Sequence, residues 1–104
     1  MICCLAVAAA IGLACSAAPR KGNPAQGKAV FEQCAPCHNV DSDARKMGPS
    51  LKGLFKRAKL ENGQKLTEGT VRAQIATGGR QMPHYQELLS PQEFDDVLAY
   101  LKTL

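Results

Sequence analysis

The sequence contains no tryptophan, and aromatic residues make up only 5% of its 104 positions. It also lacks an alternating apolar pattern long enough for a β-sheet, any internal repeat and any low-complexity linker. The first charged side chain is Arg20, so all thirteen Lys and Arg and all nine Asp and Glu residues lie from there onward. A hydrophobic content of 45% excludes a disordered chain, and the length leaves room for one small globular domain.

The uncharged first segment is typical of an export signal. Its apolar run extends from Ile2 to Ala14 and is followed by small residues around Ser16, although no Lys or Arg precedes it. The stretch 2–18 is shorter than the roughly 20 residues that a membrane-spanning helix needs. We therefore predict an export signal over residues 1–18 and a functional domain over 19–104. In the alternative of a lipoprotein-type signal, Cys15 would carry the lipid.

Two cysteines remain outside this leader, Cys34 and Cys37, which are too few for a disulfide scaffold. They stand in Cys34-Ala35-Pro36-Cys37-His38, the pattern by which c-type haem is attached to a chain. Each thiol adds across one haem vinyl group, and the two intervening residues let the chain bridge both vinyls. The adjacent His38 is then placed to bind the iron.

Two other kinds of site use the same residue types. A thioredoxin-like dithiol would follow a strand, and no apolar strand precedes Cys34. A zinc site would need four ligands, and His84 is the only further His or Cys after the leader, so carboxylates would have to serve. The pattern favours haem over both.

A second iron ligand from the protein is predicted in the loop Gly78-Gly79-Arg80-Gln81-Met82-Pro83. Such a glycine-rich loop can present the Met82 thioether, and the proline stiffens its exit. The other methionine, Met47, is only nine residues from His38, a tether that keeps it near the proximal side of the iron. His84 is the rival ligand, but a bis-histidine site would leave the Met-Pro loop without a role.

The remaining pattern indicates an all-α fold of three to four short helices. Asn23-Pro24 and Ser90-Pro91 each combine an N-cap with a proline at the first helical position. The apolar stripes that follow include Gly27, Val30, Phe31 and Cys34 in the first helix and Phe94, Val97, Leu98 and Leu101 in the last. A helix over 67–77, one or two turns at 51–55 and a turn over 60–65 complete the prediction. So small a core indicates that the haem-free chain is largely unfolded.

Four motifs in order resemble the class I cytochromes c, of the small monohaem bacterial kind, over nearly all of residues 22–104. Besides the haem pattern, they are Gly27 and Phe31 before it, and then Gly48-Pro49-Ser50-Leu51-Lys52-Gly53-Leu54-Phe55, Met82-Pro83 and Leu98-Ala99-Tyr100-Leu101. The resemblance implies the small cytochrome c fold, with its helices wrapped around one haem c attached through Cys34 and Cys37.

The resemblance also implies roles for individual residues. The carbonyl of Pro49 would accept a hydrogen bond from the proximal histidine, Arg57 would pair with a haem propionate, and Gly27 would let the first helix approach the last near Tyr100. Because the chain lacks the tryptophan that contacts a propionate in mitochondrial members, other propionate partners are open. The candidates are Asn62, Gln64 and Lys65.

Iron held by His38 and Met82 has no vacant site, which favours electron transfer over catalysis and predicts a positive midpoint potential. We expect a monomeric, non-enzymatic carrier, exported to the periplasm or the outer face of the membrane, that serves an oxidase, reductase or dehydrogenase. Six basic residues between 44 and 60 and four acidic ones between 87 and 101 predict a dipole suited to an acidic docking surface; nucleic-acid binding is not expected. The alternatives are a subunit of a larger redox complex, or a five-coordinate haem protein that binds gas or acts as a peroxidase.

Overall fold

A computed structural model of the chain describes residues 21–104, and the predicted export signal with its alternative at Cys15 lies outside these residues. The described part contains three α-helices, α1 (Pro24–Phe31), α2 (Glu68–Thr77) and α3 (Pro91–Leu101), and one short 3-10 helix, η1 (Leu54–Lys56). It contains no strand, only isolated bridges between Lys59 and Lys65 and between Gly79 and Met82. The all-α prediction is confirmed. No helix of residues 21–104 is long and apolar enough to cross a membrane.

α1 and α3 begin directly after the predicted caps, Asn23 and Ser90, and α2 begins one residue later than predicted, with Thr67 as its cap. The side chain of Asn23 accepts hydrogen bonds from the first backbone amides of α1. Thr67 and Ser90 each form a reciprocal capping box, with Thr70 and Glu93 respectively. Gly78, with φ of 61°, ends α2 as expected.

The first helix is shorter than its apolar stripe suggests. It ends at Phe31, and Cys34 lies in the turns that follow, so the prediction of Cys34 as a helical position is wrong. The backbone amides of Cys34 and Ala35 both donate to the carbonyl of Phe31. The backbone amide of His38 donates to the carbonyl of Cys34. These tight turns bring the two cysteines and the histidine back toward the centre of the molecule.

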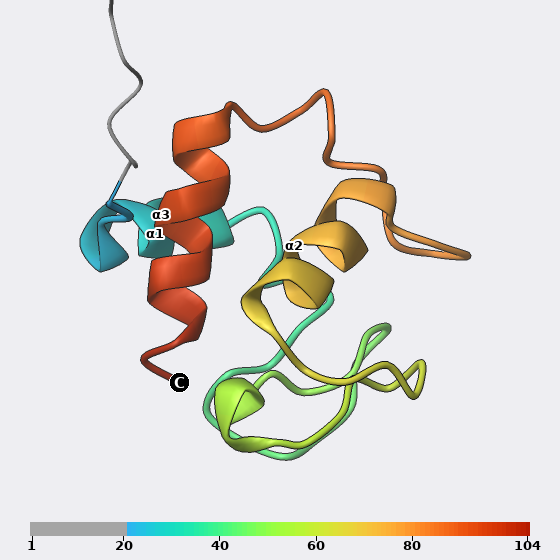
Figure 1. The fold of residues 1–104 in the computed structure, drawn as a ribbon. Coiled ribbons are helices and arrows are strands. Elements are labelled where there is room, and N and C mark those ends of the chain that lie inside the picture. Colours follow the sequence, from blue (N-terminus) through green and yellow to red (C-terminus); the bar gives the residue numbers. More distant parts are fainter. Residues whose placement is uncertain (1–20) are drawn as a thin grey trace, which may run out of the picture.

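α1 and α3 cross each other, whereas α2 contacts α3 less extensively and has the long loops beside it (Figure 1). The crossing needs a glycine at position 27, because a Cβ there would lie 1.9 Å from the backbone oxygen of Asp96 and 2.8 Å from Cβ of Tyr100. The buried carboxylate of Asp96 also accepts hydrogen bonds from the Asn23 amide and the Gln92 side chain, both at 2.8 Å. The predicted approach of Gly27 to Tyr100 is therefore present.

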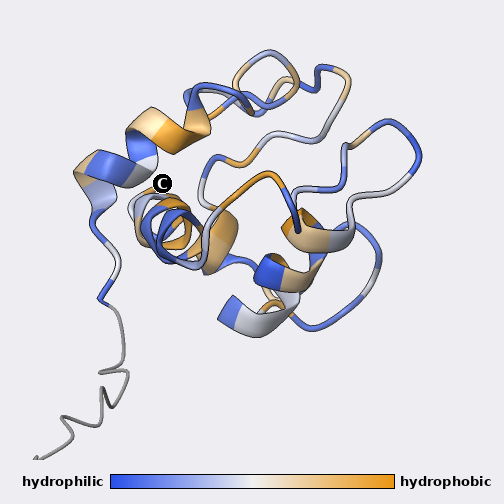
Figure 2. Cartoon of the chain, turned by 90° about the horizontal axis from the view of Figure 1, so that it is seen from above, coloured by the Kyte–Doolittle hydropathy of each residue, from blue (hydrophilic) through white to orange (hydrophobic). Residues whose placement is uncertain are grey.

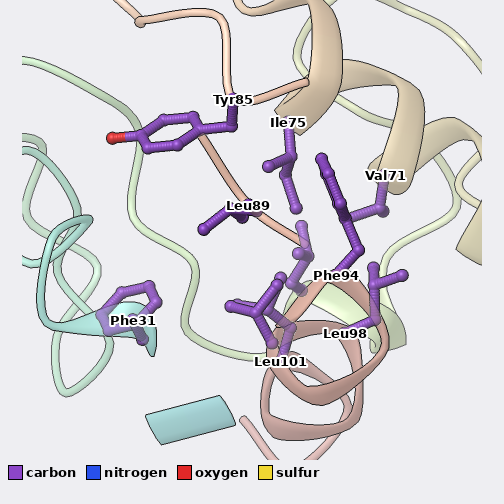
Figure 3. Close-up of a cluster of buried hydrophobic side chains, with 10 residues drawn as sticks. Phe31, Val71, Ile75, Tyr85, Leu89, Phe94, Leu98 and Leu101 are labelled. Carbon is purple, nitrogen blue, oxygen red and sulfur yellow. The ribbon is translucent and has the colours of Figure 1, made fainter. Parts of the chain in front are cut away.

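Ten buried apolar residues form the core, and they come from all of the helices and from the loop between α2 and α3 (Figure 3). They are Phe31, Leu54, Val71, Ile75, Tyr85, Leu89, Phe94, Val97, Leu98 and Leu101. Most of the hydrophilic residues lie on the long loops, whereas the apolar parts of the helices are gathered toward the middle (Figure 2). The core is thus a shared meeting point of short elements, and it borders the cavity described next.

Candidate functional site

One cavity of about 810 Å³ opens into the middle of the molecule. Its wall includes every site residue that the sequence predicts: Cys34, Cys37, His38, Pro49, Arg57 and Met82. Asn62 also lines it, whereas Gln64, Lys65 and His84 are not among its lining residues in the described part of the chain. Segments far apart in the sequence therefore converge on one space of the size that small-molecule and cofactor sites have.

The two thiols lie at this wall in a half-buried position. Burial raises the pKa of the Cys34 thiol from 9.0 to about 11, and the neighbouring Cys37 thiol adds to the rise. A thiol that keeps its proton at neutral pH is a poor nucleophile and a poor metal ligand. This argues against a thioredoxin-like dithiol, and residues 21–104 hold no group of three or more His, Cys, Asp or Glu that fits a metal ion.

His38 is held in one orientation by the loop that follows it. Its Nδ1 lies 2.7 Å from the carbonyl oxygen of Pro49. A carbonyl only accepts, so Nδ1 carries the proton and Nε2 keeps its lone pair free to bind a metal. This is the contact that the resemblance predicted for Pro49.

Gly48 allows the histidine ring to lie close to the backbone. A Cβ at this position would lie 2.4 Å from Cε1 and 2.8 Å from Nδ1 of His38. The amide of Gly48 also donates to the carbonyl of Cys37 at 2.9 Å, which ties the loop to the cysteine turn. The orientation of the ring thus depends on the absence of a side chain at residue 48.

The loop from Gly78 to Met82 is a tight turn closed by two backbone hydrogen bonds between Gly79 and Met82, of 2.7 and 3.1 Å. Gly78 adopts a left-handed φ, and a Cβ there would lie 2.4 Å from the backbone oxygens of both Met82 and Pro83. These constraints hold the half-buried Met82 side chain at the cavity wall.

Met82 also has a polar neighbour that sequence reasoning missed. Nε2 of Gln74, in α2, lies 3.9 Å from Sδ of Met82 and 3.1 Å from the carbonyl oxygen of Gly78. Gln74 follows the apolar residue Val71 by three positions and precedes Ile75, which places it beside the buried stripe of α2. That position was the only signal for it in the sequence.

The second methionine, Met47, also lines the cavity, but its side chain is 59% exposed. Its Sδ lies 4.0 Å from Sγ of Cys37, on the same loop as Gly48 and Pro49. Its position beside the cysteine turn agrees with the prediction that the short connection to His38 keeps Met47 close to that residue. Met82 is the more buried of the two thioethers.

Arg57 uses one end of its guanidinium for the chain itself. Its Nη2 donates to the carbonyls of Ser50 and Lys52, at 3.0 and 2.7 Å, which fixes the loop after Pro49. The side chain still lines the cavity. Its pairing with a propionate stays a prediction.

Tyr85 contributes the phenol of the cavity wall. The side chain is buried and its hydroxyl points away from Ile75 and Leu89 (Figure 3). Burial raises the pKa of Tyr85, with smaller contributions from the thiols of Cys34 and Cys37. The phenol therefore stays neutral in a mainly apolar wall.

Comparisons with known proteins agree with this arrangement. A family model described as cytochrome c matches residues 24–104. The chain is 35% identical over 86 residues to a cytochrome c-553-like protein of Synechocystis sp., a match that covers 81% of this chain and 71% of that protein. It is 32% identical over 108 residues to cytochrome c2 of Blastochloris viridis, covering 86% and 85% of the two chains. The structure of cytochrome c6 from the diatom Phaeodactylum tricornutum superposes with a TM-score of 0.61 at 27% identity, over 79% of this chain and 93% of that one.

Proposed function

Because the chain belongs to the cytochrome c family, whose members transfer electrons and carry one covalently attached haem c, we propose that it is an exported one-electron carrier with haem bound to Cys34, Cys37, His38 and Met82. When bound, the haem would supply the one-electron redox chemistry. The chain would supply two thiols for attachment, the His38 imidazole and the Met82 thioether as iron ligands, and a largely apolar enclosure. A neutral thioether ligand would favour the ferrous state and thus a positive midpoint potential.

The cavity carries this proposal, because its wall offers what such a group needs. Two thiols, an imidazole with a free Nε2 and a thioether line one space of about 810 Å³. Apolar core residues such as Leu54, Ile75 and Val97 form much of the rest of the wall. These apolar residues would exclude water from the bound group and would so influence its potential.

A pair of methionine variants tests the ligand assignment. We expect Met82→Ala to remove the long-wavelength thioether-to-iron band of the ferric protein and to lower the midpoint potential. Met47→Ala is the matched control, because it removes the other thioether of the cavity wall, and it should change neither. A loss of the band in Met47→Ala or in His84→Ala, with Met82→Ala unchanged, would show that the assignment is wrong.

The same preparation tests attachment. Protein exported from a host with haem-ligation machinery should be coloured, and its mass should exceed that of the processed chain by one haem. Cys34→Ser and Cys37→Ser should each retain at most one thioether bond. A colourless product with the mass of the amino acids alone would refute the proposed function as a whole.

We propose that the basic segment between residues 44 and 60 forms the docking surface for the redox partner. Lys52, Lys56 and Lys59 are exposed and form no ion pair among the described residues. On the acidic side, Asp95 pairs with Arg72 at 2.9 Å and Asp96 is buried against α1, so part of the predicted negative end is neutralised internally. A redox partner with an acidic surface fits this distribution, and association should slow steeply as ionic strength rises.

A further inference from the structure

Met47 is one of two large apolar side chains that are mostly exposed among the described residues, at 59%; the other is Leu88, at 62%. Of these two, only Met47 also lines the cavity. Its Sδ lies 4.0 Å from Sγ of Cys37, one of the two thiols proposed to hold the haem. A thioether therefore lies in contact with solvent at the edge of the cavity, beside an attachment point.

The backbone on both sides of Met47 is fixed by hydrogen bonds. The amide of Lys46 donates to the carbonyl of Gly48 at 3.1 Å, and the amide of Gly48 donates to the carbonyl of Cys37 at 2.9 Å. Nζ of Lys46 also donates to the carbonyl of Ala35, at 3.1 Å. Met47 is thus presented by a turn that is joined to the cysteine turn at two points.

The two thioethers of the described chain differ in how open they are to an oxidant. The Met82 side chain is half-buried, and its Sδ lies 3.9 Å from Nε2 of Gln74. As the proposed iron ligand, Met82 would also have a sulfur lone pair engaged with the metal. Oxidation of methionine needs an accessible sulfur with a free lone pair. Met47 meets this requirement better than Met82.

Met47 also lies within the basic segment between residues 44 and 60, the proposed docking surface. It is the one large apolar side chain of this segment that is mostly exposed. Protein interfaces combine apolar contacts with a polar or charged rim. The lysines of the segment supply charge, and Met47 is the residue that can supply an exposed apolar contact.

We propose that Met47 is an oxidation site through which hydroperoxides weaken the docking of the protein to its redox partner. A sulfur lone pair attacks one oxygen of hydrogen peroxide and the O–O bond breaks, so that a sulfoxide and one water molecule form. The sulfur loses two electrons, the peroxide gains them, and both peroxide hydrogens leave in the water. The apolar thioether becomes a polar but uncharged group. The inference rests on the proposed function of the protein as a carrier that docks through residues 44–60.

The site of oxidation is measured by mass spectrometry of tryptic peptides after the ferric, haem-loaded protein is exposed to hydrogen peroxide. Trypsin places the two methionines in separate peptides, because Lys46 and Arg80 lie between them and the preceding chain. We expect Met47 to gain one oxygen atom at least about ten times faster than Met82, with the thioether-to-iron band retained. Equal rates at the two residues, or loss of the band as Met47 is oxidised, would contradict the proposal.

The effect on docking is measured on a gold electrode coated with a mixed monolayer of carboxylate- and methyl-terminated alkanethiols, which offers an acidic and partly apolar surface. Peroxide treatment should raise the protein concentration needed for half-maximal adsorption by about three- to tenfold. The dependence on ionic strength should stay the same, because no charge is lost. Methionine sulfoxide reductases should restore the original concentration.

Three variants serve as controls. Met47→Leu keeps an apolar side chain that peroxide does not oxidise, so peroxide should not change its adsorption. Met47→Gln carries a polar side chain of similar length and should adsorb, untreated, like the oxidised wild type. Leu88→Gln removes the other exposed apolar side chain, outside residues 44–60, and should not weaken adsorption. A peroxide effect in Met47→Leu, untreated wild-type adsorption of Met47→Gln, or an equal loss in Leu88→Gln would each overturn the proposal.

The untreated wild type separates this outcome from a failure of the proposed function. If the untreated protein holds no haem and exchanges no electrons with the electrode, the proposed function fails. If it gives a reversible current and peroxide oxidises Met47 without changing adsorption, only the role of Met47 is refuted.

Discussion

Replacing Gly48 with alanine should disrupt the proximal ligand by adding a single methyl group. A Cβ at position 48 would lie 2.4 Å from Cε1 of His38. Favourable contacts between carbon atoms lie near 3.5–4.0 Å, so the ring or the loop must move by about 1 Å. That movement also strains the hydrogen bond of 2.7 Å between the ring and the Pro49 carbonyl.

The size of the effect follows from these two contacts. Inserting a methyl group into a packed site costs about 1–3 kcal/mol, and losing one hydrogen bond costs about 1 kcal/mol. We therefore expect Gly48→Ala to lower the free energy of unfolding of the haem-loaded protein by about 2–4 kcal/mol. Because His38 is the proposed ligand, the absorption spectrum and the midpoint potential should change as well.

Guanidinium chloride unfolding, followed by the haem spectrum, measures this difference. Gly69→Ala in α2 is the matched control, because its Cβ would meet only Oγ1 of Thr67, at an ordinary 3.7 Å. Alanine in a helix is favoured over glycine, so this variant should gain about 0.5–1 kcal/mol. If Gly48→Ala kept wild-type stability and spectrum, the close packing of the ring against this loop would be refuted.

Two further predictions concern the α1–α3 contact and the free thiol. Asp96→Ala leaves the Asn23 amide and the Gln92 side chain without their acceptor, so denaturant unfolding should show a loss of about 1–3 kcal/mol; Asp96→Asn keeps Oδ1 and should lose less, and equal losses would contradict this role. In the haem-free chain, we expect the alkylation rate of Cys34 to rise with pH with a midpoint near the ordinary thiol pKa of 9.0, as in an unfolded chain. Mass spectrometry of the labelled peptide at a series of pH values measures this midpoint. A midpoint of about 11 would instead show that the fold persists without haem. Such a folded state would lose stability between these two pH values, because the unfolded thiol would ionise first.

Features that depend on neighbours in the sequence were predicted well. The predicted caps at Asn23 and Ser90 fix the starts of α1 and α3 through contacts within three residues. The attachment pattern is equally local, since its residues span only positions 34–38. A local pattern determines such elements because the bonds that stabilise them close within one turn of chain.

Features that depend on distant contacts were not predicted. The end of α1 at Phe31 is set by how the cysteine turn must fold back toward the cavity, which the apolar spacing does not encode. The loop conformations depend on contacts such as Arg45 with Glu61 and Ser50 with the backbone of Ser42. The link from Asn62 to Gln74 spans twelve positions and joins a turn to a helix. Exposed polar residues of this kind give no periodic signal.

The cavity and the hydrophobic core are largely one structure, which explains why haem is expected to be needed for folding. Of the ten core residues, only Phe94 and Leu98 are absent from the cavity wall. If an apolar space of about 810 Å³ stayed dry, the side chains that line it would lack packing partners, which is strongly unfavourable for a small domain. A haem-free chain must therefore collapse the cavity or let water into it, and either change alters the surroundings of the eight core residues that line the cavity.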